Sequence, residues 1–324
     1  MKTLDHTDLE SSLSASRTQL MCCASFEERS MRLPFVLVER NWDNVIVFQN
    51  TDVPREIDHA EKIISRVKNG VIKDISVASP TSTADVFCQV IKKYKISGWK
   101  LVIDFSTFTH EHLLILVKSL EYMEIDLCKV VWIYCRVKEY SINEENEKKW
   151  LSKGVRDIRS ILGFSGEFSP ELPTSLLILV GFESTRARSV IDAIEPQSLF
   201  LGKADSEHSE SHEMAIVNEM FHNLVLEGYQ NLSESNVESF TFSSNDASAV
   251  AKYISEYARK LKGKANLVIV PMNTKVSTLG VAWAFLQESS PHFQVVYAQA
   301  EVYNMDGYSE ASDSCYLLEN IFCK

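Results

Sequence analysis

The residues of this chain best suited to bind a ligand follow an apolar stretch in its second half. Asn273, Thr274 and Lys275 separate that stretch from a helical pattern. A hydroxyl, an ammonium group and the amides of a helix start together suit a phosphate or a ribose. In the alternative, Ser277 or Thr278 is the N-cap of the helix and Lys275 is a surface charge. The residues leave both interpretations open.

Two similar turns form a second candidate site, because each follows an apolar segment and carries charge. One reads Ser-Phe-Glu from Ser25, and the other reads Gly-Phe-Glu from Gly181. A helix start favours anions, and arginines close by in the sequence could neutralise a phosphate. Alternatively, each glutamate complements the helix dipole and pairs with an arginine one turn on. If the chain is an enzyme, Glu27 or Glu183 is the candidate general base. The candidate ligand-binding residues of the two turns are Ser25, Arg29, Phe182, Glu183, Arg186 and Arg188.

Motifs for nucleophilic catalysis and metal binding are weak. GxSxG, HExxH and CxxC are absent, and the eleven glycines are too scattered for a GxGxxG or Walker A loop. Cys22 and Cys23 fall in a predicted buried strand, where packing is the favoured role. His208 and His212 fall in an acidic, serine-rich segment, which favours a solvated loop over a zinc site. We therefore expect no metal and no cofactor.

Composition and charge exclude several classes of protein. The 324 residues carry a net charge of −11, which argues against a broad nucleic-acid-binding surface. The longest apolar runs, Val130–Cys135 and Val281–Leu286, fall far short of the ~20 residues of a membrane span. No secretory signal is visible, and seven scattered cysteines suit a reducing cytosol better than a disulfide framework. The expected location is cytoplasmic.

Apolar segments alternate with helical patterns along the whole chain, which predicts an α/β fold with mostly parallel sheets. The expected strands are 19–24, 44–49, 72–78, 100–105 and 129–137, then 175–180, 198–201, 239–242, 266–270 and 293–298. One helix is expected to start near residue 25. The other expected helices cover 55–68, 83–94, 112–122, 186–194, 213–226, 247–261 and 277–287. Residues 205–213 are expected to form a solvated, mobile loop, and the tail beyond Tyr308 reads as irregular.

The two halves resemble each other in detail, which indicates an internal duplication. Phe-Glu follows the first apolar segment of each half, and the closing segments share spaced tyrosines. The fold class is therefore two duplicated Rossmann-like units with mostly parallel sheets flanked by helices. The expected boundaries are a polar tail at 1–18, a first unit at 19–141, a charged linker at 142–174 and a second unit at 175–324.

The strand, Asn-Thr-Lys loop and helix of Val268–Trp283 resemble the last part of CARF domains. These are the CRISPR-associated Rossmann-like sensors of cyclic oligoadenylates. Where that family has a Gly-Gly-Thr-Lys type of loop, this chain has Met272 and Asn273 before Thr274 and Lys275. The resemblance implies that Thr274 and Lys275 contact a ligand. It also implies a prokaryotic protein of antiviral defence.

The function expected from these features is ligand sensing or partner binding, with a nucleotide or another phosphate-bearing small molecule as the ligand. A protein partner or a homo-oligomer is also expected, and neither a membrane nor a broad nucleic-acid surface is. The alternatives are a nucleotide or nucleoside hydrolase or transferase that uses a glutamate of the turns, and a structural subunit of a multi-protein complex.

Overall fold

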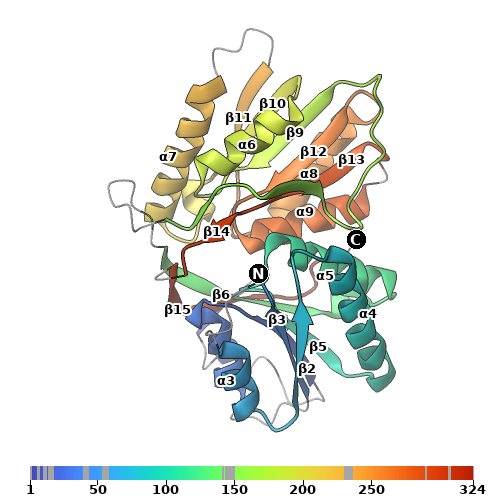
Figure 1. Cartoon of the computed structure of the whole chain (residues 1–324), viewed down its shortest axis with the longest axis vertical. Coiled ribbons are helices and arrows are strands. Elements are labelled where there is room, and N and C mark those ends of the chain that lie inside the picture. The colour runs from blue at the N-terminus through green and yellow to red at the C-terminus, as the bar shows by residue number, and fades with distance from the viewer. Residues whose placement is uncertain are drawn as a thin grey trace. The chain divides into compact units, whose positions relative to one another are not determined.

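A computed structural model gives the structure of this chain, which folds as two units (Figure 1). Unit 1 comprises Met1–Tyr140 and Ser309–Lys324, and unit 2 comprises Ser141–Tyr308. The structure describes residues 2–5, 8–9, 13, 18–38, 44–52, 58–140, 142, 150–229, 236–288, 290–305 and 308–323.

Unit 1 is built around a seven-stranded sheet in the order β1-β15-β6-β5-β2-β3-β4. Five strands are parallel: β2 (Thr18–Ala24), β3 (Asn44–Asn50), β4 (Gly70–Ile75), β5 (Lys100–Asp104) and β6 (Val131–Tyr140). Two antiparallel pairings extend this sheet beyond β6, through β15 (Ser309–Leu318) and then β1 (Lys2–Asp5). Its helices are α2 (Arg32–Val38), α3 (His59–Arg66), α4 (Pro80–Ser97) and α5 (His110–Tyr122), with short 3-10 turns at Glu28–Met31 and Leu127–Lys129.

Unit 2 is built around a six-stranded sheet in the order β11-β10-β9-β12-β13-β8. Its parallel strands are β9 (Thr174–Leu179), β10 (Ser198–Ala204), β11 (Asn236–Phe242), β12 (Asn266–Pro271) and β13 (Phe293–Gln299), and β8 (Asp157–Ser160) pairs antiparallel with β13. Its helices are α6 (Ser184–Ile194), α7 (His212–Tyr229), α8 (Ala247–Leu261) and α9 (Lys275–Gln287). A separate antiparallel pair joins β7 (Ser152–Lys153) to β14 (Val302–Tyr303).

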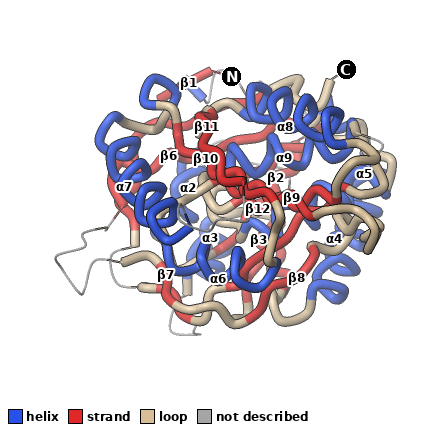
Figure 2. Tube along the Cα trace, turned by 90° about the horizontal axis from the view of Figure 1, so that it is seen from above, coloured by secondary structure: helices blue, strands red, loops and turns tan. Residues whose placement is uncertain are grey.

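The two units share one topology. In each, the five parallel strands lie in the order third, second, first, fourth, fifth. Right-handed crossovers in this order place the first two helices on one face of the sheet and the last two on the other. The helix pairs agree, because α4 packs on α5 and α8 packs on α9. Figure 1 shows α4 and α5 together and α3 apart from them, and Figure 2 shows α8 beside α9. The predicted fold class of two Rossmann-like units is confirmed.

The central strands of both sheets are buried on both faces. Strands β9 and β12 contain no exposed residue, as expected for parallel strands covered by helices on each side. In unit 1, Cys22 and Cys23 of β2 are 1% and 2% exposed. Their burial agrees with the packing role expected from the sequence.

The edges of the sheets differ from the predicted boundaries. The tail beyond Tyr308, expected to be irregular, forms the ten-residue strand β15, and the N-terminal tail contributes β1. The segment 142–174, expected to be a linker, contains β7 and β8 in unit 2. Only Cys315–Leu318 of β15 is apolar and buried. Strands with so few apolar residues are identified only through the strands with which they pair, so the hydrophobic periodicity of the sequence does not reveal them.

Three local expectations also change. The chain after Ser25 forms a 3-10 turn before α2 begins at Arg32, so the expected helix starts late. The segment 205–213 is ordered by a 3-10 turn that Asp205 caps, and Glu210 in it is buried. Cys128 and Cys323 are bonded, with Cα atoms 5.2 Å apart, so one disulfide is present where the sequence suggested reduced cysteines.

Candidate functional site

The candidate site of unit 2 lies where the connections of its sheet diverge. Neighbouring strands β9 and β12 lead into α6 and α9, which lie on opposite faces. In open α/β sheets, ligands bind beyond the carboxyl ends of the strands at this switch point. The turn that starts at Gly181 and the loop Met272–Lys275 therefore meet at the position where the fold favours a ligand.

Gly181 is required by the close approach of these two segments. A Cβ atom added at Gly181 would lie 1.9 Å from the carbonyl oxygen of Met272. That oxygen belongs to the backbone, so it cannot move aside as a flexible side chain would. The Ser25 turn of unit 1 carries a side chain at the matching place, so the tight approach is a feature of unit 2.

We expect Gly181→Ala to lower the free energy of unfolding by about 1–3 kcal/mol, the usual effect of overpacking. Urea denaturation measures this change. The matched control is Gly228→Ala in α7, where the nearest atom to an added Cβ is 3.5 Å away. Because alanine favours a helix interior over glycine by up to about 1 kcal/mol, the control variant should be at least as stable as the parent. Equal stability of the two variants would contradict the contact described.

Asn273 links the two segments and leaves one buried polar atom unsatisfied. Its Nδ2 donates to the carbonyl of Val180 at 2.7 Å, while Oδ1 is buried without a hydrogen-bond partner. The carbonyl of Val180 can only accept, so the amide group must face it and Oδ1 must face away. Unpaired buried acceptors are costly, so a hydrogen-bond donor, either a water or a group of a ligand, is expected at this oxygen. The sequence predicted Asn273 as a binding residue but gave no reason for this orphaned oxygen.

Thr274 is the N-cap of α9. Its Oγ1 accepts from the amide of Ser277 at 3.1 Å and donates to the carbonyl of Ser244. The hydroxyl proton is therefore used within the fold, and Thr274 is 6% exposed. Of the two interpretations left open by the sequence, capping describes Thr274, although the cap is Thr274 itself and not Ser277 or Thr278.

Lys275 is the first residue of α9 and is half-buried. Its backbone therefore lies in the first turn of the helix, whose free amides form the positive end of the helix dipole. A helix terminus of this kind favours an anion. The placement expected from the sequence, at the carboxyl edge of the sheet, is the one in the structure.

The glutamate of the unit 2 turn is engaged by neighbouring residues. Arg186 Nε lies 2.8 Å from Glu183 Oε2, and both side chains are 11% exposed. Ser152 of β7 donates its hydroxyl proton to Glu183 Oε1. Arg186 Nη1 also donates to the carbonyl of Ala298, at 3.4 Å. This set of four groups joins the turn after β9 to β7 and β13.

Unit 1 contains a similar set, although its serine comes from β15, after the last parallel strand of the unit, and not from a strand before the first. Arg29 Nη2 lies 3.0 Å from Glu27 Oε2, and Ser309 of β15 donates its hydroxyl proton to the same carboxylate. Arg29 Nη1 donates to the carbonyl of Cys135 at 3.0 Å. The cluster joins the turn after β2 to β6 and β15. Its repetition supports the duplication inferred from the Phe-Glu turns.

Both arginines are held charged in these clusters. Burial alone would lower the pKa of the Arg29 guanidinium, but the Glu27 carboxylate outweighs burial and raises it. The same two opposing effects, with Glu183 as the carboxylate, raise the pKa of Arg186. Each carboxylate accepts from an arginine and a serine of its own unit, and these partners hold the turn to neighbouring strands. We call the two clusters structural clasps. In each, the glutamate pairs with an arginine, as in the alternative that the sequence left open, although Arg29 lies two positions from Glu27 and not one turn on.

The remaining predicted residues of the turns pack within the fold. Phe182 lies edge-to-face with Phe221 of α7, with ring centroids 6.5 Å apart. Arg188 donates to the carbonyl of Leu224 in α7, so it joins two helices. The carbonyl of Ser25 lies 2.7 Å from Nδ1 of His59 in α3. These contacts attach the turns to their own units. In none of them does the side chain of Phe182 or Arg188 contact Asn273.

Sequence reasoning missed Asn218, which holds the Gly181 turn in place. This fully buried side chain in α7 donates to the carbonyls of Val180 and Gly181, at 2.8 and 2.9 Å. Its Oδ1 accepts from the amide of Ala204 at 2.7 Å. A polar residue inside a helix gives no sequence pattern, so only its burial reveals this role.

Unit 1 has a buried polar pair at the matching edge that the sequence also missed. The amide and hydroxyl of Ser106 both donate to Asp104 Oδ1. The Ser106 hydroxyl oxygen accepts from the amide of Cys135 at 2.7 Å. Asp104 is 2% exposed and follows the apolar part of β5 directly. In the sequence, this pair could have been recognised from a carboxylate, Asp104, placed directly after a run of buried apolar residues.

The described residues contain neither a candidate metal cluster nor a helix that could span a membrane. Within residues 2–323, apart from the undescribed gaps, no group of three or more His, Cys, Asp or Glu side chains could hold a metal ion. In the same part of the chain, no helix is both long enough and apolar enough to cross a membrane.

Comparison with known proteins gives only distant structural likenesses. No family model matches the chain, and no curated protein matches it. The Cra transcriptional dual regulator from Pseudomonas putida, in complex with fructose 1-phosphate, is 10% identical with a TM-score of 0.27, over 86% of this chain and 77% of that one. A universal stress protein from Archaeoglobus fulgidus is 12% identical with a TM-score of 0.24, over 87% and 96% of the two chains. The fold class rests on strand order and pairing.

Proposed function

We propose that unit 2 is a ligand-binding module that recognises a nucleotide through the loop Met272–Lys275. The observation that carries the proposal is the buried, unpaired Oδ1 of Asn273 beside the N-terminus of α9. An unpaired acceptor calls for a ligand that can donate a hydrogen bond, as a ribose hydroxyl or a base amino group does. The helix terminus and Lys275 call for an anion. A nucleotide supplies both groups in one molecule.

Binding without catalysis is the reading we favour. The candidate general bases, Glu27 and Glu183, are each held by an arginine and a serine. In line with the resemblance to CARF domains, we place the module in the cytoplasm of a prokaryote and in antiviral defence, where a ligand would alter contacts with a protein partner or a second copy.

Thermal unfolding tests this function directly. A ligand that binds only the folded state raises the melting temperature by mass action. The panel comprises AMP, ADP, ATP, cyclic AMP and a cyclic oligoadenylate, each at about 1 mM, which detects even modest affinity. Absence of any shift across the panel would refute the proposed function.

We expect Lys275→Ala to weaken binding of the active nucleotide by about tenfold or more, because a charge-assisted contact to phosphate is lost. The melting temperature without nucleotide should change little, since a single half-buried charge contributes little to folding. Titration calorimetry measures the affinity. Lys262→Ala, which removes an exposed lysine at the end of α8, is the matched control and should bind as the parent does. Unchanged affinity in Lys275→Ala would remove this loop from the site.

A further inference from the structure

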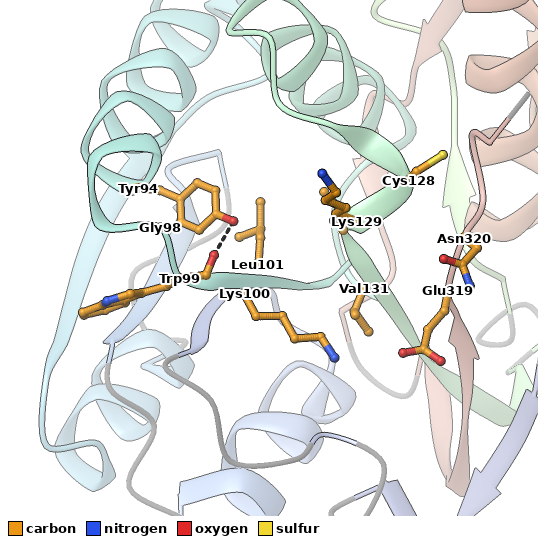
Figure 3. Close-up of a pocket in the computed structure, with 11 residues that line it drawn as sticks. Tyr94, Gly98, Trp99, Lys100, Leu101, Cys128, Lys129, Val131, Glu319 and Asn320 are labelled. Atoms are coloured by element: carbon orange, nitrogen blue, oxygen red, sulfur yellow. Dashed lines mark hydrogen bonds between the residues drawn. The ribbon is translucent and has the colours of Figure 1, made fainter.

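The residues 319–323, which follow β15 in unit 1, form a segment that we call the C-terminal strap. Strand β15 runs antiparallel to β6, and its last residue, Leu318, lies opposite Trp132. Beyond this pair, Cys323 of the strap is bonded to Cys128, in the 3-10 turn that precedes β6. Figure 3 shows Cys128 with Glu319 and Asn320 at one side of a hollow that all three line. The strap therefore joins the end of β15 to the segment before β6.

The strap packs on a fully buried tryptophan. The ring of Phe322 lies against the ring of Trp132, with centroids 5.8 Å apart. Trp132 is 0% exposed, and Ile321 of the strap is 8% exposed. Trp132 also lies edge-to-face with Phe105, with centroids 6.1 Å apart. The strap thus contributes an aromatic contact that covers part of the indole ring.

Two features of this closed arrangement are unfavourable. Asn320 and Phe322 have φ angles of 55° and 66°, in the left-handed region that residues with a side chain rarely adopt. Nε1 of Trp132 is buried and has no hydrogen-bond partner in the part of the chain that the structure describes. A buried donor without a partner costs free energy, which water would recover if it reached the ring. A covalent bond that holds the strap in place offsets such costs.

The bond that holds the strap is accessible to a reductant, because Cys128 and Cys323 are both half-buried. Disulfides that solvent reaches are the ones most readily reduced. A thiolate of a dithiol reductant attacks one sulfur, the S–S bond breaks and a mixed disulfide forms. The second thiol of the reductant then displaces the protein sulfur. Two electrons and two protons pass to the chain, Cys128 and Cys323 become thiols, and the reductant becomes a disulfide.

A second pair of cysteines between β6 and β15 is protected from this chemistry. Cys135 lies directly opposite Cys315, with the two Sγ atoms 3.3 Å apart. Both residues are 0% exposed and are thiols. Buried thiols react slowly, because the reactive thiolate is disfavoured away from water. This pair reacts only when β15 separates from β6, so it reports whether that strand stays paired.

We propose that the C-terminal strap is a redox-sensitive switch. The Cys128–Cys323 disulfide keeps residues 319–323 closed over Trp132, and reduction by a dithiol releases them and uncovers the indole. Strand β15 stays in the sheet, because Cys315–Leu318 are buried and paired with β6. The switch belongs to unit 1 and goes beyond the nucleotide binding proposed for unit 2.

Hydrogen exchange and tryptophan fluorescence of the full chain, with and without dithiothreitol, test the release. We expect the amides of Asn320–Cys323 to lose protection on reduction and the emission to shift to longer wavelength. Trp132→Phe identifies the source among the five tryptophans, because its emission should not respond to dithiothreitol. Cys323→Ser should show the emission of the reduced parent whether or not dithiothreitol is present.

Alkylation by iodoacetamide, read by mass spectrometry, separates release of the strap from unfolding of unit 1. The half-buried thiol of Cys88 should be modified in every sample. Cys128 and Cys323 should be modified only after reduction. Cys135 and Cys315 should stay unmodified in both states until the chain is denatured.

Three results would overturn the proposal. The first is an exchange pattern and an emission spectrum that reduction leaves unchanged. The second is modification of Cys135 or Cys315 in the reduced chain before denaturation, which would show that β15 opens with the strap. The third is alkylation of Cys128 and Cys323 in chain equilibrated with oxidised glutathione, which would show that the disulfide does not form.

Discussion

Ending the chain after Tyr308 is expected to unfold the sheet of unit 1 while unit 2 keeps its structure. The deletion removes β15, whose Tyr316, Leu317 and Leu318 are 1–3% exposed. Burial of three such side chains contributes about 5–9 kcal/mol. That is comparable with the whole stability of a typical domain, about 5–15 kcal/mol. The deletion also leaves β6 and β1 without their shared neighbour.

Hydrogen exchange followed by mass spectrometry measures this outcome. Amides of β2, β3 and β5 should lose protection, whereas those of β9 and β12 should keep it. A chain ended after Leu318 is the matched control, because it lacks the final six residues, including Cys323, but keeps β15 whole. Full protection of β2 and β5 in the chain ended after Tyr308 would show that β15 is dispensable for unit 1.

Replacing the buried arginine of either clasp should be the most damaging single substitution considered. Arg29→Ala leaves the Glu27 carboxylate, 8% exposed, without its cation. Removing one partner of a buried pair costs about 3–5 kcal/mol, because the remaining charge stays buried. Arg29→Ala should therefore destabilise unit 1 by this amount, and Arg186→Ala should do the same to unit 2.

Urea denaturation of each variant measures the loss. The matched control is Arg32→Ala, whose side chain is 44% exposed and pairs at 3.6 Å with Asp313, which is 93% exposed. An exposed pair of this kind contributes less than about 1 kcal/mol. Adding Glu27→Ala to Arg29→Ala should recover part of the lost stability, since it removes the uncompensated carboxylate. If Arg29→Ala and Arg32→Ala prove equally stable, the clasp does not stabilise unit 1.

The clasps also explain how the same residue types supported two interpretations. In both turns a glutamate stands close to an arginine in the sequence, as Glu27 does to Arg29 and Glu183 to Arg186. This pair of residue types suits an anion-binding site, and it also suits a general base beside a cation. Ser309 lies 282 positions from Glu27 along the chain. Until that serine and the carbonyl of Cys135 are placed, nothing in the local sequence distinguishes a binding turn from a structural clasp.

The candidate site of unit 2 was found from the sequence in part. The sequence predicts the loop and the start of the helix because Asn273, Thr274 and Lys275 stand between an apolar segment and a helical pattern. The partners of these side chains are remote: Val180 for Asn273, and Ser244 for Thr274. Capping by Thr274 and the orphaned oxygen of Asn273 therefore became visible only in the folded unit.

The sequence by itself determined the α/β class, the ten parallel strands and the repetition of one unit. Apolar segments and helical periodicity indicate the type of each element and which of its faces is buried, and this pattern can be recognised within the element's own residues. Only the tertiary structure decided which strands complete each sheet. β8 follows unit 1 in the chain but pairs with β13, and β15 follows β13 but pairs with β6. Pairing at a sheet edge depends on backbone groups that every residue carries, so side-chain pattern cannot specify the partner.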